Sequence, residues 1–295
     1  MAANAPDFAR FVAIDWSGAK GRRHKGIAIA VAEAGRATPA LVRPGHVWSR
    51  QEVLDWLIAY ATEAPTLFGF DFSFAPPIAA RGSYLPGVID LPGEAKSFWA
   101  YIDDRCQDED LGAASFLEQT HRPHFYFGAA DGVKRDFLHH RVCEERFNAG
   151  GGGKASTVYD AIGAAQVAKA SFAGMRLLHH ADGRLPIWPF DIAWSEPFDP
   201  LPTYGSLIIE IYTRAFIRLA GLSGRKVRDP DQLARALQAL GSEPGCPDRQ
   251  LSDHETDVLI AAAGLRAIAD DPHRWSPPGL TPLLARTEGW TFGVV

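Results

Sequence analysis

Two apolar runs each end in an aspartate: Phe11-Val12-Ala13-Ile14-Asp15 and Leu67-Phe68-Gly69-Phe70-Asp71. Strands favour apolar and aromatic residues and disfavour Asp, so each aspartate marks the point where a strand leaves the core. Open α/β sheets bind their ligands at the carboxyl edge of the strands. We therefore expect Asp15 and Asp71 to lie side by side at that edge. For either strand alone, an Asp that caps a turn or a helix is the simpler interpretation.

The composition is typical of a soluble globular protein. The chain has 295 residues, 46% of them hydrophobic, which suits one large domain or two ordinary ones. The first residues lack the pattern of a signal peptide, and no apolar run reaches the length of a membrane span. Three widely spaced cysteines fit neither a disulfide framework nor a CxxC metal site. We expect a reduced, cytoplasmic protein with no membrane partner, and the net charge of -5 leaves room only for local contacts with nucleic acid.

The order of the predicted elements distinguishes between two α/β folds. Strands at 11–16, 26–31 and 40–42 form a meander, a helix follows from Ser49 to Tyr60, and a fourth strand ends at Asp71. No GxGxxG motif follows the first strand, as a Rossmann domain would require. We predict an α/β, ribonuclease H-like fold with a mixed five-stranded sheet, in which a three-stranded antiparallel meander joins parallel strands and helices flank the sheet.

A large insertion is predicted after the fourth strand, within a single domain of residues 1–295. Residues 76–153 are rich in Pro, Gly, His and aromatic residues, with helical patches at 96–103 and 131–147. So long an insertion is expected to serve as a lid or a substrate wall. The elements predicted after it are a helix at 156–180, strands at 186–190 and 206–212, and helices at 230–240 and 253–269.

The last predicted helix opens with the acidic sequence Ser252-Asp253-His254-Glu255-Thr256-Asp257. The first and fourth residues of this run match a capping box, and acidic residues suit the positive end of a helix dipole. Asp257 is different, because it lies at the start of the buried stripe and should point toward the sheet edge. His254 and Asp253 precede it by three and four residues, so both can share its face.

These motifs, in this order, resemble a prokaryotic family of predicted RNase H-fold nucleases. The resemblance is carried by Asp15-Trp-Ser-Gly-Ala, Phe-Asp71-Phe-Ser, Ile-Glu210-Ile-Tyr, His254-x-x-Asp257 and the closing Glu-Gly-Trp-Thr-Phe-Gly. In the related Holliday-junction resolvases of the RuvC type, acidic residues on the first strand, the fourth strand and the last helix form the metal site. The resemblance implies that Asp15, Asp71 and Asp257 are metal ligands and catalytic residues, with His254 beside them. Glu210 is a further candidate for both roles, and Asp253 for metal binding.

Clustered carboxylates of this kind suit Mg²⁺ or Mn²⁺, which prefer hard oxygen ligands. Two ions roughly 3.5–4 Å apart can stabilise the attacking water and the leaving oxygen of phosphodiester cleavage. We therefore expect a nuclease that uses two metal ions, with DNA or RNA as its substrate. A basic turn follows Asp15, and its side chains are the candidates for phosphate contact: Lys20, Arg22, Arg23 and Lys25. The same turn could equally be a solvated hairpin tip.

Two other functions remain open at this point. Actin-like and sugar-kinase ATPases also carry an Asp on the first and fourth strands, with a hairpin that cradles phosphate. They normally duplicate the domain and add a Gly-rich adenosine motif, for which Ala261-Ala-Ala-Gly264 is a poor substitute. The third possibility is a non-catalytic binding module that uses the acidic cluster structurally.

Overall fold

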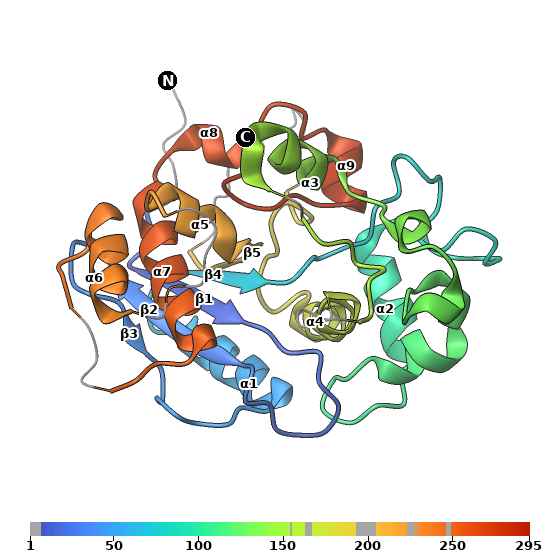
Figure 1. Ribbon diagram of the computed structural model, residues 1–295, viewed down its shortest axis with the longest axis horizontal. Coiled ribbons are helices and arrows are strands. Elements are labelled where there is room, and N and C mark those ends of the chain that lie inside the picture. The colour runs from blue at the N-terminus through green and yellow to red at the C-terminus, as the bar shows by residue number, and fades with distance from the viewer. Residues whose placement is uncertain are drawn as a thin grey trace.

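A five-stranded mixed sheet forms the centre of the protein in the computed structural model, which describes residues 7–153, 155–162, 167–192, 205–222, 227, 229–245 and 249–295 (Figure 1). The strand order is β3-β2-β1-β4-β5. The strands are β1 (Arg10–Asp15), β2 (Ala28–Glu33), β3 (Ala40–Leu41), β4 (Thr66–Asp71) and β5 (Leu207–Glu210). β1 to β3 are antiparallel neighbours, whereas β1, β4 and β5 run parallel. The predicted α/β class and the mixed five-stranded sheet are confirmed.

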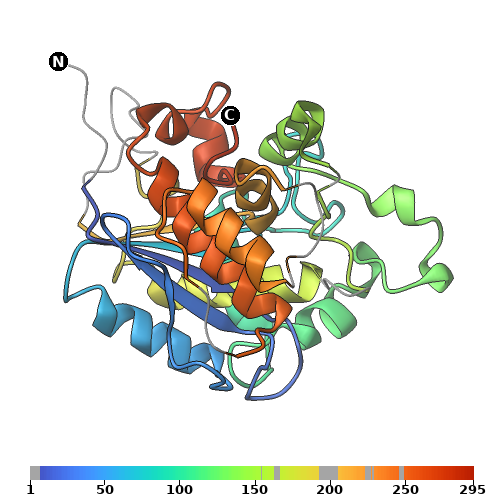
Figure 2. The ribbon, with the colours of Figure 1, turned by 60° about the vertical axis from the view of Figure 1, so that its left-hand side comes forward.

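Each face of the sheet is buried beneath helices because its strands are apolar on both sides. Val12 and Ile14 of β1 belong to one core, and Phe11 and Ala13 belong to the other, as the two-residue period of a strand requires. Helices α1 (Arg50–Tyr60) and α4 (Val167–Ala181) cover the first face. Helices α6 (Pro230–Ala239) and α7 (Asp253–Ile268) cover the second (Figure 2).

Five further helices complete the described part of the fold. They are α2 (Ala95–Arg105), α3 (Val142–Phe147), α5 (Thr213–Leu219), α8 (Pro272–Trp275) and α9 (Pro282–Thr287). Single 3-10 or π-helical turns occur at Phe116–Thr120, Arg122–His124, Ala129–Asp131, Lys134–Phe137 and Asn148–Gly152. Among the described residues, no helix is both long enough and apolar enough to cross a membrane.

The segment predicted as an insertion is built into the body of the protein. Phe98, Trp99 and Ile102 of α2 are fully buried in the same core as α1 and α4. The helical patch predicted near 131–147 is interrupted, since the chain forms the 3-10 turn at Lys134–Phe137 and begins α3 only at Val142. The break has a physical reason, because Arg141 adopts an extended conformation before α3 and buries its guanidinium group in an ion pair.

Two other predicted elements differ from the structure. Residues 155–162 are not helical: Tyr126 donates its backbone N–H to the carbonyl of Tyr159 and accepts one from Ala161. Residues 163–166 lie outside the described part, so the described part of that helix is α4 alone. The strand predicted at 186–190 is reduced to one bridge, Ile187 to Ile208. Asp191 accepts the Ile187 N–H at 2.6 Å and turns the chain there.

Candidate active site

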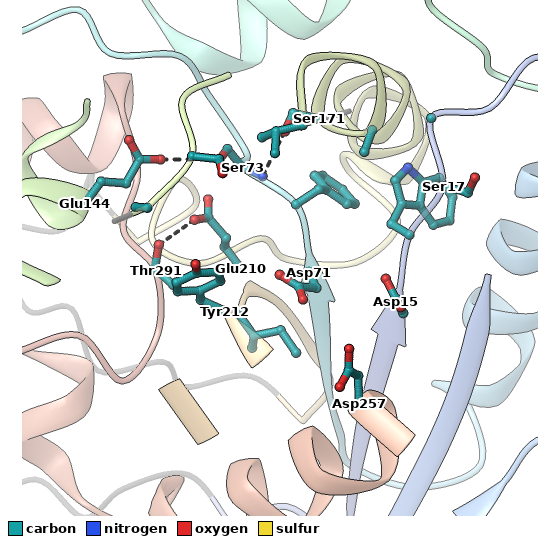
Figure 3. A pocket seen from close by; sticks show the side chains of 18 of the residues that line it. Asp15, Ser17, Asp71, Ser73, Glu144, Ser171, Glu210, Tyr212, Asp257 and Thr291 are labelled. Atoms are coloured by element: carbon teal, nitrogen blue, oxygen red, sulfur yellow. Dashed lines mark hydrogen bonds between the residues drawn. The ribbon is translucent and has the colours of Figure 1, made fainter. Parts of the chain in front are cut away.

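Three carboxylates meet at one edge of the sheet, as the sequence suggests. Asp15 and Asp71 are directly opposite each other in the parallel register of β1 and β4. Asp257 comes from α7, and Figure 3 shows the three side chains directed toward the same space. All three line a cavity of about 510 Å³. The carboxylates therefore belong to one site, although they are up to 242 positions apart in the chain.

The N-terminus of α7 is fixed at this edge by the predicted capping box. Ser252 Oγ accepts the N–H of Glu255, and Glu255 accepts the N–H of Ser252 at 2.9 Å. A hydrogen bond from Arg249, with those from Ser252, lowers the pKa of Glu255 to about 2 although burial opposes the shift. Glu255 is thus a structural carboxylate. Asp253 lies in the first turn of α7 and is not among the described residues that line the cavity, so we leave it out of the proposed ligand set.

Asp71 has a strongly perturbed carboxyl group. Burial raises its pKa to about 7, and the negative charges of Asp15 and then Asp257 act in the same direction. Hydrogen bonds from the side chain and backbone of Thr213 oppose the shift. Thr213 is the first residue of α5, a helix that the sequence prediction missed. The sequence carried no capping signal for it, because the N-cap position is Tyr212, whose side chain makes no capping hydrogen bond.

Asp15 is held by the helix that carries Asp257. His254 Nδ1–H donates to Asp15 Oδ2 at 2.6 Å, and the imidazole is about half exposed. His254 therefore lies where the sequence predicts, beside the carboxylates. It orients Asp15, and it neutralises that carboxylate when it is protonated.

The donor set fits a divalent cation by its chemistry but is not closed around a metal position. Three carboxylates offer hard oxygen ligands, and two of them raise the pKa of the third, which is the effect of like charges that a cation would relieve. Across the described ranges, no group of three or more His, Cys, Asp or Glu side chains is arranged to hold a metal ion as it stands. Metal binding would therefore require side chains to move, Asp15 away from His254 above all.

Glu210 is engaged in a different interaction at the same edge. Both of its oxygens bind the guanidinium group of Arg141, and it also accepts the Phe74 N–H at 2.7 Å and the Thr291 hydroxyl. Arg141 is 1% exposed and also pairs with Glu144 at 3.0 Å. Burial alone would lower the pKa of Arg141, yet Cys143 and the carboxylates of Glu210 and Glu144 hold it well above its ordinary value. Because its oxygens are taken by these donors, the geometry does not favour the predicted role of Glu210 in metal binding or catalysis, although it lines the same cavity.

The basic turn between β1 and β2 is paired with acidic residues and does not face the cavity. Three of its four cations bind a carboxylate at 2.5–2.7 Å: Lys20 binds Glu118, Arg22 binds Glu109 and Arg23 binds Glu52. The fourth, Lys25, is exposed. None of the four is among the described residues that line the cavity. The geometry therefore does not favour the predicted phosphate contacts, because these side chains would have to exchange their partners.

A buried arginine that the sequence did not single out holds the part of the cavity lining that follows Asp15. The Arg50 guanidinium group is fully buried and donates to the carbonyls of Ser17 at 2.7 and 2.9 Å and of Ala19 at 2.7 Å. Asp110 accepts the backbone N–H of Arg50 at 2.9 Å and binds His24. These contacts fix the chain directly after Asp15. They could not be found from a local pattern, because Asp110 is 60 positions away from Arg50.

Other residues that line the cavity also lacked a sequence signal. Ser171 of α4 accepts the Ser73 N–H at 3.2 Å, and Glu144 accepts the Ser73 hydroxyl at 3.4 Å. Cys143 lies beside them, but burial raises the pKa of its thiol to about 12, so it is not a reactive nucleophile. The segment 76–153 therefore does supply a wall of the cavity, through α3.

Comparisons with protein families, with curated proteins and with solved structures find no significant match to this chain.

Proposed function

We propose that the protein is a nuclease that depends on Mg²⁺ or Mn²⁺ and hydrolyses phosphodiester bonds of nucleic acid. The observation that carries the proposal is the convergence of Asp15, Asp71 and Asp257 on one cavity. The raised pKa of Asp71 adds to it, because perturbed carboxyl groups in a cavity are candidates for functional groups.

The strand order supports an RNase H-like assignment for the fold. An antiparallel meander of three strands is followed by a helix and by two parallel strands, and the first strand lies at the centre of the sheet. In this arrangement the ends of β1 and β4 are adjacent, so the two aspartates are neighbours by topology. The resemblance of the motifs to RuvC-type resolvases points to the same ligand set.

Asp15, Asp71 and Asp257 would hold the metal ions in this proposal. Bound divalent ions would supply Lewis acidity and lower the pKa of a bound water. Asp71 must release its proton to act as a ligand, and the nearby charges of Asp15 and Asp257 make that release unfavourable until a cation is present. His254 holds Asp15 in place through Nδ1–H before binding.

Metal-dependent thermal stabilisation tests the ligand set. At a Mn²⁺ concentration of about 100 times Kd, the wild-type protein should gain about 2.7 kcal/mol, or several degrees in Tm. Asp15→Asn should abolish this gain, whereas Asp104→Asn, an exposed carboxylate of α2, should keep it. The wild type and Asp104→Asn should cleave labelled DNA or RNA, and Asp15→Asn should not. An equal response to metal in wild type and Asp15→Asn would refute the ligand set.

A second candidate, ATP-dependent phosphate transfer, is favoured by one observation, the cavity itself. Its volume of about 510 Å³ lies in the range of roughly 300–1,000 Å³ that is usual for small-molecule sites. The basic turn that would cradle phosphates in such an enzyme is paired with carboxylates outside the cavity. ATP turnover measured beside nuclease activity separates the two functions.

A further inference from the structure

The cavity continues from the carboxylates into the interior between two walls. On one wall, Ala170 and Ser171 of α4 face it, and on the other wall Glu144 and Phe147 of α3 do so. A volume of about 510 Å³ suits a ligand of the size of one nucleotide, since small-molecule sites measure roughly 300–1,000 Å³. A double helix must instead be bound along an open surface. A cavity of this size therefore favours a substrate that places a single nucleotide in it, as the end of a strand can do.

Aromatic side chains stand directly beside the carboxylates. Figure 3 places the Tyr212 ring next to Asp71, on the side away from Asp15. Phe147 packs edge-on against Tyr212 with ring centroids 5.0 Å apart, and Phe72, the residue after Asp71, lines the same cavity. Aromatic faces bind bases of any sequence by stacking. The cavity thus offers a surface for one base within reach of the proposed cleavage centre.

Among the residues that the structure describes, the lining of this cavity lacks the cationic side chains that a long strand needs. Proteins that bind extended nucleic acid neutralise many phosphates with Lys and Arg. Among the described lining residues, Arg141 is the only Lys or Arg, and it is bound to Glu210 and Glu144. The wall can therefore contact few phosphates, which suits a strand end better than a strand interior.

We propose that the site accepts one terminal nucleotide of a nucleic-acid strand, with its base beside Tyr212 and its phosphodiester at the three aspartates. This inference rests on the proposed nuclease function. The oxygen of water bonds to phosphorus and the bond from phosphorus to the oxygen of the neighbouring nucleotide breaks. One water proton goes to that leaving oxygen, and the other stays on the phosphate or enters solvent. The products are a nucleoside monophosphate and a strand shorter by one residue.

The first experiment compares a linear single-stranded oligonucleotide with the covalently closed circle of the same sequence, as DNA and as RNA, in Mn²⁺. The linear strand should be shortened one nucleotide at a time, more than tenfold faster than the circle is opened. Equal cleavage of the circle would overturn the inference and leave the nuclease function standing. If neither substrate is cleaved, the nuclease function and this inference fall together.

A pair of variants tests whether the cavity itself holds the nucleotide. Ala155 is a partly exposed lining residue, and Ala149 is exposed nearby and does not line the cavity. Ala155→Phe should narrow the cavity and slow mononucleotide release at least tenfold, whereas Ala149→Phe should release mononucleotides at the wild-type rate. Both variants should keep the rise in Tm with Mn²⁺, which shows that they are folded. Unchanged release in Ala155→Phe would overturn the inference.

Discussion

Asp71→Asn is expected to stabilise the metal-free protein at pH 8 and to stabilise it only about a third as much at pH 5. In the folded protein, burial and the charges of Asp15 and Asp257 raise the pKa of Asp71 to about 7 from its ordinary 3.8. The unfolded chain loses this proton near pH 4, whereas the folded chain keeps it until about pH 7. Between these values the folded state binds more protons, so the free energy of unfolding falls as pH rises.

The size of the effect follows from the pKa difference. At 1.36 kcal/mol per pKa unit, the ionised Asp71 destabilises the metal-free fold by up to about 4 kcal/mol above pH 7. The side chain keeps some contact with solvent, which screens its charge and reduces this figure, so we expect about 2–4 kcal/mol. Asparagine carries no charge, which removes the penalty while its side-chain oxygen still accepts a hydrogen bond from Thr213.

Urea unfolding at pH 5, 6, 7 and 8 in the presence of a chelator measures this prediction. Asp110→Asn is the matched control, because that carboxylate behaves in the opposite way. Burial alone would raise the pKa of Asp110, but hydrogen bonds from His24 and from the backbone of Gln51 and Arg50 lower it. Asp110→Asn should therefore destabilise the protein at pH 8, by about 2 kcal/mol. A stabilisation by Asp71→Asn that is equal at pH 5 and pH 8 would contradict the reasoning.

Two further substitutions test the structure around the cavity. Glu210→Gln removes one partner of a buried ion pair and leaves Arg141 undercompensated, so it should cost about 3 kcal/mol in urea unfolding. A loss within the error of the measurement would show that the pair does not stabilise the fold. Gly174→Ala places a Cβ 2.3 Å from the Phe72 ring and should cost about 1–3 kcal/mol, read as a lower midpoint of thermal unfolding. An unchanged midpoint would mean that the ring moves aside freely.

Local patterns were sufficient to predict the part of the site that the sheet topology controls. Asp15 and Asp71 are the last residues of two adjacent parallel strands, and Asp257 begins the buried stripe of α7. The direction of each side chain therefore follows from its own strand or helix. Long-range charge pairing has no such local signature. Arg141 lies 69 positions before Glu210, and Glu109 lies 87 positions after Arg22. The roles predicted for Glu210 and for the basic turn therefore needed the structure.

The two kinds of acidic residue at this sheet edge differ in what neutralises them. Glu210 ends the neighbouring strand β5, and the protein supplies its counter-charge through Arg141, which also ties α3 to the sheet. The charges that raise the pKa of Asp71 are those of other carboxylates. A carboxylate compensated from within serves the fold, whereas a carboxylate held among like charges gains most from a cation supplied by the solvent. The Arg141 pair thus holds the α3 wall in place over the three aspartates that we propose as metal ligands.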